Sequence, residues 1–157
     1  MADPDPWDLP TPYVMELVVQ PQDIDAYSHV NNAVYVTWFD RAAWSHSSVL
    51  GLAIERCLAL NRGMAVLRSE IAYQRPALLG DRVEVATWLL AGNGKLRVRR
   101  RFLARRLSDG VTLSRAEIEY VCIELSSGRP VRWPAEFHAS YAVSAAVTQA
   151  SKALAPL

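Results

Sequence analysis

The polar residues best suited to chemistry lie together in one short stretch, residues 23–32. It contains Asp23, Asp25, Ser28, His29, Asn31 and Asn32. Serine and asparagine favour helix N-caps, because a short side-chain oxygen accepts an unpaired backbone N–H. A carboxylate just before a helix start lies beside free N–H donors and the positive end of the helix dipole. The stretch therefore combines a proton acceptor with donors for negative charge, although an aspartate in such a loop often only satisfies backbone donors.

A helix that positions this loop is predicted directly after it. Val30, Val34, Trp38 and Ala42 recur every four residues, which is the spacing of one helix face. Aromatic and small residues fill the neighbouring positions, so nearly the whole circumference is apolar up to Asp40. We predict a helix from about residue 31 to about 48. It must be covered on most sides and therefore lies in the middle of the domain.

The rest of the chain has the period of two that is typical of strands. Strands are predicted at residues 13–20, 64–74, 82–90, 96–107 and 112–124, with short additions at 53–61 (helix), 131–133 (strand) and 134–141 (helical turn). One strand, one long apolar helix and a four-strand meander indicate an α+β fold, with an antiparallel sheet of about five strands wrapped around the helix. The second face of the sheet would meet water or another sheet, which favours self-association.

The domain boundaries follow from composition. Residues 1–12 contain four prolines and three aspartates and are expected to form a flexible leader. Residues 13–141 form one domain, and the small, polar residues 142–157 form a helical or frayed C-terminal tail.

Net charge, hydropathy and cysteine spacing argue against several kinds of partner. The net charge of +1 gives no reason to expect nucleic acid or an anionic membrane, and no apolar run approaches the roughly 20 residues of a membrane span. Cys57 and Cys122 are far apart and lack metal-ligand spacing, and no cluster suggests a metal site. Two free thiols suit a reducing cytoplasm, where we expect the protein to be.

Two motifs in this sequence resemble a known family. The first is Asp23-Ile-Asp25-Ala-Tyr-Ser-His29-Val-Asn31-Asn32-x-x-Tyr35, and the second is Ile71-x-Tyr73-x-x-Pro76-Ala77-x-x-Gly80-Asp81-x-Val83. Both are similar to the hotdog-fold thioesterases, in particular to the 4-hydroxybenzoyl-CoA thioesterase-like branch. The resemblance covers residues 13–137.

The resemblance implies a hydrolase that cleaves an acyl-CoA thioester at the interface of a homodimer or homotetramer. Asp25 would be the catalytic carboxylate, acting as base or nucleophile, and the backbone N–H near Asn32 would polarise the thioester carbonyl. His29 matches a histidine in the site of the plant acyl-ACP thioesterases. Those enzymes carry an asparagine where Tyr27 stands and a glutamate near the position of Pro76, so acyl-ACP is the weaker substrate expectation. No cofactor is expected apart from the CoA of the substrate.

The remaining candidates are binding residues with structural alternatives. Tyr27, Asn31, Tyr35 and Tyr73 are candidate substrate contacts, although Asn31 also suits a loop-fixing role and His29 a loop hydrogen bond. Arg97, Arg99 and Arg101 alternate on one face of a predicted strand. They are expected to grip the CoA phosphates or to form a solvated strand face. Leu96, Val98, Phe102 and Ala104 would face the other way, with Arg100 as the exception among them.

Two rival functions use the same fold. Hotdog hydratases and dehydratases carry Asp-x-Asn-Pro-x-His, whereas Ala-Tyr-Ser separates Asp25 from His29 here. A non-catalytic acyl-binding protein would bind acyl-CoA without turnover, and the intact Asp25 argues against it.

Overall fold

The computed structural model describes residues 6–157. The elements are β1 (Tyr13–Val18), the short 3₁₀ helix η1 (Pro21–Asp23), α1 (Asn32–Val49), α2 (Ile54–Leu60), β2 (Arg62–Tyr73), β3 (Arg82–Leu90), β4 (Arg97–Arg106), β5 (Thr112–Glu124), α3 (Ala135–Ser140) and α4 (Ala145–Ser151). The five strands form one antiparallel sheet in the order β1-β3-β4-β5-β2. The predicted helix and five strands are all present. The N–H groups of Val131 and Trp133 donate to the carbonyls of Cys122 and Lys95, but residues 131–133 form no strand.

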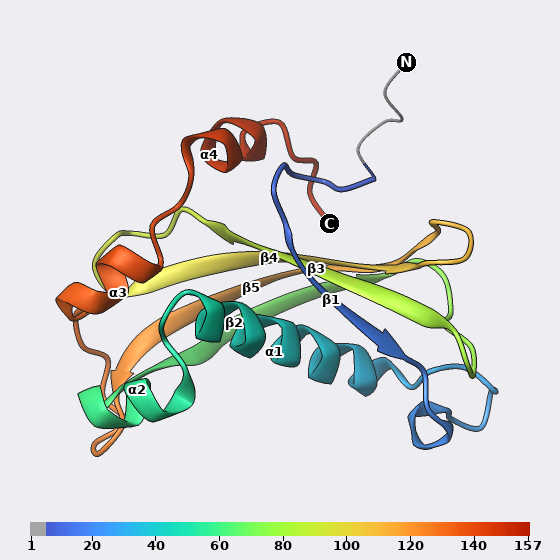
Figure 1. The fold of residues 1–157 in the computed structure, drawn as a ribbon, viewed down its shortest axis with the longest axis horizontal. Coiled ribbons are helices and arrows are strands. Elements are labelled where there is room, and N and C mark those ends of the chain that lie inside the picture. The colour runs from blue at the N-terminus through green and yellow to red at the C-terminus, as the bar shows by residue number, and fades with distance from the viewer. Residues whose placement is uncertain (1–5) are drawn as a thin grey trace.

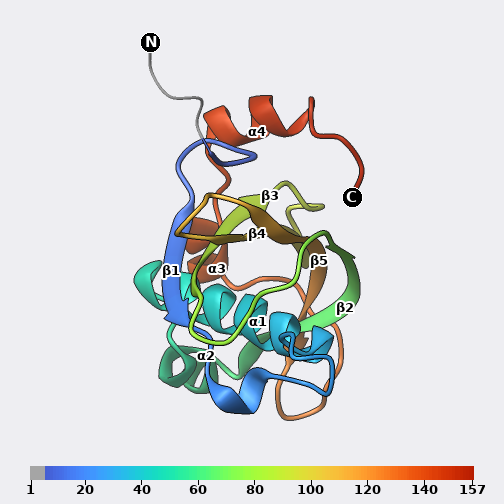
Figure 2. The ribbon, with the colours of Figure 1, turned by 90° about the vertical axis from the view of Figure 1, so that its right-hand side faces the viewer.

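The sheet curls around α1, which runs along its concave face (Figures 1 and 2). Tyr35, Trp38, Phe39 and Ala42 of α1 are all at most 2% exposed. The ring of Phe39 packs on that of Phe102 in β4, with centroids 5.1 Å apart. Burial of these side chains between helix and sheet forms the main core, because removal of apolar surface from water drives folding.

The opposite face of the sheet has a second, smaller core. Trp88, Leu90 and Leu103 point to that face and pack with Leu9 and Val147. Leu9 comes from the segment before β1, and Val147 comes from α4, which lies over this face in Figure 1. The prediction that this face meets only water or another sheet is therefore wrong. Its apolar strand residues are covered by the two ends of the described chain.

The expected leader and tail thus contact the domain. Residues 1–5 of the leader lie outside the described part of the chain, but Leu9 is 2% exposed. The Trp88 indole donates a hydrogen bond to the Pro10 carbonyl (3.0 Å). In the tail, Ser144 caps α4 by accepting a hydrogen bond from the Val147 N–H. Among the described residues, no helix is both long enough and apolar enough to cross a bilayer.

Replacing Leu9 with alanine should lower the free energy of unfolding by about 2–4 kcal/mol, because it removes a buried side chain and leaves a cavity over the outer face of the sheet. The matched control is Leu58→Ala on α2, where the side chain is 62% exposed and the change should stay within about 0.5 kcal/mol. Urea unfolding followed by circular dichroism measures both. Equal effects of the two substitutions would contradict the packing of the N-terminal segment.

Candidate active site

The loop before α1 is held by its own hydrogen bonds. The Asp23 carboxylate accepts a hydrogen bond from the Gln20 N–H (2.8 Å), and the Asp23 carbonyl accepts one from the Asn31 N–H (2.8 Å). A β-bridge joins Ile24 to Val30. These contacts close the loop on itself, and the Asp23 carboxylate helps to fix it.

Asp25 lies inside this closed loop and is half-buried. Its Oδ1 accepts a hydrogen bond from the Tyr27 N–H (2.8 Å), and its own N–H donates to the His29 carbonyl (2.8 Å). Within the described residues, no hydrogen bond to the second carboxylate oxygen is formed. Asp25 is therefore fixed in position and still has one oxygen to accept a proton or attack a substrate atom.

The start of α1 leaves one backbone donor unpaired. Asn31 is the N-cap, and its Oδ1 accepts a hydrogen bond from the Ala33 N–H (2.9 Å). The Asn31 carbonyl accepts one from the Val34 N–H (2.9 Å). The first N–H groups of a helix lack partners within the helix, and the described part of the chain offers no acceptor to the N–H of Asn32. That donor is available to a ligand.

Asp25, His29 and Asn32 line one open cavity of ≈ 310 Å³. Tyr27, Tyr35 and Tyr73 also line it, as do residues 74–76 of the loop after β2. The Tyr73 hydroxyl donates a hydrogen bond to the Asn32 carbonyl (3.1 Å), which ties β2 to the helix start. The structure thus brings together all three predicted catalytic residues and three of the predicted binding residues, while Asn31 serves as the helix cap beside them.

The three tyrosines of this cavity differ in exposure. Tyr27 is 83% exposed and Tyr73 is 45% exposed, whereas Tyr35 is 2% exposed. The Tyr35 hydroxyl accepts a hydrogen bond from the Ala77 N–H (3.1 Å), and burial raises the pKa of Tyr35 above its usual value. Tyr35 therefore contributes a neutral aromatic wall and fixes the loop after β2.

The structure does not bring Arg97, Arg99 and Arg101 to this cavity. They lie on the face of β4 opposite α1, where Arg97 pairs with Glu119 (3.1 Å) and Arg99 with Glu117 (3.7 Å). Arg101 is 3% exposed and forms ion pairs with Asp8 and Glu117, both at 3.0 Å. The expected solvated strand face fits Arg97 and Arg99, whose side chains are about half exposed, whereas Arg101 is buried in its ion pairs.

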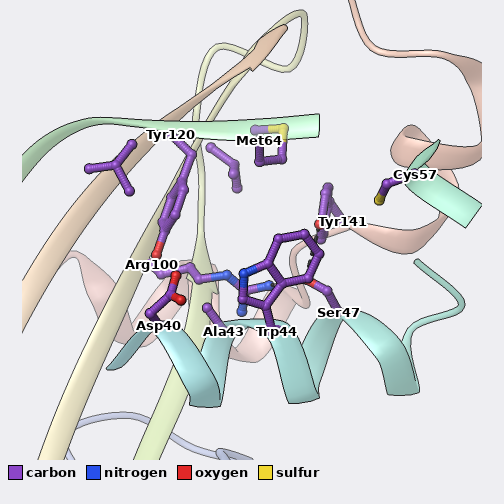
Figure 3. A pocket seen from close by; sticks show the side chains of 11 residues that line it. Asp40, Ala43, Trp44, Ser47, Cys57, Met64, Arg100, Tyr120 and Tyr141 are labelled. Atoms are coloured by element: carbon purple, nitrogen blue, oxygen red, sulfur yellow. Dashed lines mark hydrogen bonds between the residues drawn. The ribbon is translucent and has the colours of Figure 1, made fainter. Parts of the chain in front are cut away.

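A second cavity of ≈ 50 Å³ lies farther along α1. Figure 3 shows Asp40, Trp44 and Ser47 rising from α1 toward Met64 of β2 and Tyr120 of β5. Arg100 of β4 forms part of the wall and is 3% exposed. Arg100, a charged residue at an inward position of β4, therefore lies on the core side of the sheet. The sequence did not predict this cavity, and the charged residue at an inward position was the feature that could have indicated it.

The partners of the Arg100 side chain are polar and uncharged. Its Nη1 lies 2.9 Å from His46 Nδ1, and its Nη2 donates to Ser47 Oγ (3.0 Å). Burial and the neighbouring Arg100 lower the pKa of His46 from its usual value of 6.5 to about 4. His46 is therefore neutral at pH 7, and its ring stacks on Tyr13 with centroids 5.0 Å apart.

Within residues 6–157, no group of three or more histidine, cysteine, aspartate or glutamate side chains could hold a metal ion.

Comparison with known sequences places these features in a family context. The model of the thioesterase-like superfamily matches residues 19–141, which include the whole loop, α1 and the sheet apart from β1. The long-chain acyl-CoA thioesterase FadM of Escherichia coli is 29% identical over 116 residues, which are 71% of this chain and 83% of FadM.

Solved structures share the fold. A 1,4-dihydroxy-2-naphthoyl-CoA thioesterase from Synechocystis superposes with a TM-score of 0.75 at 19% identity, covering 83% of this chain and 96% of that one. A Staphylococcus aureus protein solved in complex with CoA gives 0.76 at 20% identity, covering 83% of this chain and 81% of its own. These similarities confirm the predicted α+β architecture.

Stability should fall as the pH is lowered from about 6.5 to about 4, because in this range the unfolded chain binds a proton at His46 that the folded chain does not. Replacing His46 with glutamine keeps an acceptor for Arg100 and removes the titration. Urea midpoints at pH 7 and pH 5 should differ less for this variant than for the wild type. Identical pH dependence in the two proteins would show that His46 does not contribute.

Proposed function

The chain belongs to the thioesterase-like superfamily and is a thioester hydrolase of the hotdog fold, and we propose that it hydrolyses acyl-CoA at the cavity that contains Asp25 and Asn32. The observation that carries the proposal is the pairing of a partly free carboxylate with an unpaired helix N-terminal N–H on one cavity wall. Thioester hydrolysis needs these two groups, a base or nucleophile and an oxyanion donor.

In the base form of the mechanism, Asp25 takes a proton from a water molecule, and the resulting hydroxide attacks the thioester carbonyl carbon. In the nucleophile form, the Asp25 carboxylate attacks that carbon itself, and water then cleaves the mixed anhydride. In both forms the Asn32 N–H donates to the developing oxyanion, a contribution of roughly 2.7–4 kcal/mol for a well-placed donor. Collapse of the tetrahedral intermediate expels CoA as its thiolate, a weak base that needs no strong general acid.

His29 has a supporting role in this proposal. Its ring lines the same cavity and is exposed, and its carbonyl accepts the Asp25 N–H. The ring can therefore contact the substrate, while its backbone fixes the position of the carboxylate. Tyr27 and Tyr73 would contact the acyl or pantetheine part of the substrate from the cavity rim.

Two findings support CoA as the carrier of the acyl group. The similar E. coli enzyme is named as a long-chain acyl-CoA thioesterase, and the similar S. aureus structure contains CoA. We also propose a cytoplasmic location, which the two buried free thiols Cys57 and Cys122 support.

We propose that the active form is a homodimer or a tetramer built from such dimers. β2 is an edge strand of 12 residues, so one side of it presents unpaired backbone groups. Val66, Leu67 and Tyr73 on this strand are 45–56% exposed. Association along β2 would cover this apolar edge and bring a second subunit next to the cavity that Tyr73 lines.

Replacing Asp25 with asparagine should lower kcat for acyl-CoA hydrolysis by about 10²–10⁴-fold, because the amide neither accepts the proton nor attacks the carbonyl. The matched control is Asp23→Asn, whose side chain only receives the Gln20 N–H and which should keep most activity. Release of free thiol from short, medium, long and aromatic acyl-CoAs measures the rates. Full activity of the Asp25 variant would remove that residue from the mechanism.

The dimer predicts a solution mass of twice 17.5 kDa or a multiple of it. Replacing Leu67, which is 49% exposed on β2, with lysine should shift the protein toward monomer because it places a charge in the apolar contact. Leu79→Lys is a matched control, since Leu79 is 60% exposed in the loop between β2 and β3. Light scattering distinguishes the species, and a wild-type monomer would refute the proposed assembly.

A further inference from the structure

Arg100 is a buried cation whose charge is not neutralised by a neighbouring acid in the described part of the chain. It is 3% exposed, and its hydrogen bonds go to His46 and Ser47. Arg101, the next residue, is equally buried but has two carboxylate partners, Asp8 and Glu117. Burial of an ion without a counter-ion is strongly unfavourable. The lack of an acidic partner for Arg100, beside the two partners of Arg101, therefore suggests that a ligand supplies the missing negative charge.

The groups around Arg100 are neutral at pH 7. The pKa of His46 is lowered to about 4, and burial raises the pKa values of Tyr120 and Tyr141 above their usual range. The Ser47 and Tyr141 hydroxyls hydrogen-bond to each other at 3.0 Å, and the guanidinium carbon lies 5.8 Å from the centroid of the Tyr141 ring. Burial lowers the pKa of Arg100 below its usual value, and none of these neutral groups offsets the cost of the buried charge as an anion beside it would.

The cavity next to Arg100 has the size and lining for a small anionic group on an apolar arm. Its ≈ 50 Å³ compares with the roughly 10–15 Å³ that one water needs, so a carboxylate and its first methylene groups fit. Ala43, Cys57 and Val98 form buried apolar walls. Trp44 and Val66, which also line the cavity, are 38% and 56% exposed.

We propose that this cavity binds a carboxylate group carried on a slender aliphatic chain, with the Arg100 guanidinium as its counter-ion. A guanidinium presents two parallel N–H donors that match the two oxygens of a carboxylate. The cavity is separate from the Asp25 cavity, because Ala43 follows Asn32 by eleven helical residues, or about 16 Å along α1. Both cavities lie between α1 and β2, at different ends of these elements.

The carboxylate of Asp40 can be used to test whether the ligand beside Arg100 is negatively charged. It lies on the cavity wall, seven residues before Ser47 and thus about 10 Å from it along the helix. Its side chain is exposed and forms no ion pair within residues 6–157. An anionic ligand seated on Arg100 would be repelled weakly by Asp40, whereas a neutral or cationic ligand would not.

The binding test uses the full chain with sodium octanoate as the probe and 1-octanol as the neutral control of equal chain length, measured by isothermal titration calorimetry. Arg100→Gln should weaken octanoate binding by at least about ten-fold and leave 1-octanol binding unchanged. Arg100→Lys, which keeps the charge and loses the fork, should fall between the wild type and Arg100→Gln. Asp40→Asn should strengthen octanoate binding by about two- to three-fold.

The proposal can still be tested with Asp40→Asn if Arg100→Gln fails to fold. Asp40 is on the surface of α1, so its substitution leaves the core intact, and a tightening of octanoate binding would support the charge argument by itself. The proposal is overturned if the wild type binds octanoate no better than 1-octanol, or if Arg100→Lys and Asp40→Asn bind octanoate as the wild type does.

The carboxylate has two possible sources, and a second measurement distinguishes them. Hexadecanoyl-CoA is compared with the CoA monothioester of hexadecanedioic acid, which has the same chain length, a terminal carboxylate and a chain long enough to span the about 16 Å between the two cavities. If the terminal carboxylate raises kcat/KM and Arg100→Lys reduces this advantage, the ligand is the far end of the substrate, an outcome that rests on the proposed hydrolase function. If octanoate binds but the two thioesters react equally, the ligand is a free carboxylic acid. The octanoate result does not require hydrolysis, so failure of one proposal leaves the other testable.

Discussion

The burial of α1 in the concave face of the sheet is the constraint on which the rest of the structure depends. Phe39 and its apolar neighbours on the helix need cover on several sides, and the curled inner face of β3, β4 and β5 provides it. This packing fixes where the helix begins, and therefore where its unpaired N–H groups point. The Asp25 loop, closed by Asp23 and Asn31, is a short connection between that helix start and β1. The packing of the core therefore also determines the geometry of the candidate active site.

The elements that could be predicted from sequence are those specified by local chemistry. Apolar residues every four positions predicted α1, and alternation predicted the strands. The serine and asparagine residues before the helix indicated a capped start, and Asn31 is the cap in the structure. The joint position of Asp25, His29 and Asn32 followed from their place in one short loop ahead of a helix. Such features depend on residues that are close in sequence, so a single sequence specifies them well.

The features that were missed depend on residues far apart in the chain. The cover over the outer face joins Leu9 and Val147 to Trp88, and nothing in the sequence around any of them indicates the others. The three outward arginines of β4 have the right type and spacing to bind phosphate, and their ion pairs with Glu117 and Glu119 of β5 and with Asp8 are not apparent from the sequence of β4. Arg100 broke the alternation of β4, yet its environment is made by His46 and Ser47 from α1, over fifty positions earlier. Charge on a strand can be interpreted only when the partner strands are known.

The way the two ends of the described chain pack has a practical consequence. The segment around Leu9 and helix α4 both lie on the side of the sheet opposite α1 (Figures 1 and 2). Affinity tags, fluorescent fusion partners or surface-attachment linkers joined before Trp7 or after α4 would therefore emerge from the back of the molecule. The two cavities beside α1 would keep open access to solvent, so an immobilised or tagged protein is suited to ligand measurements without removal of the added sequence.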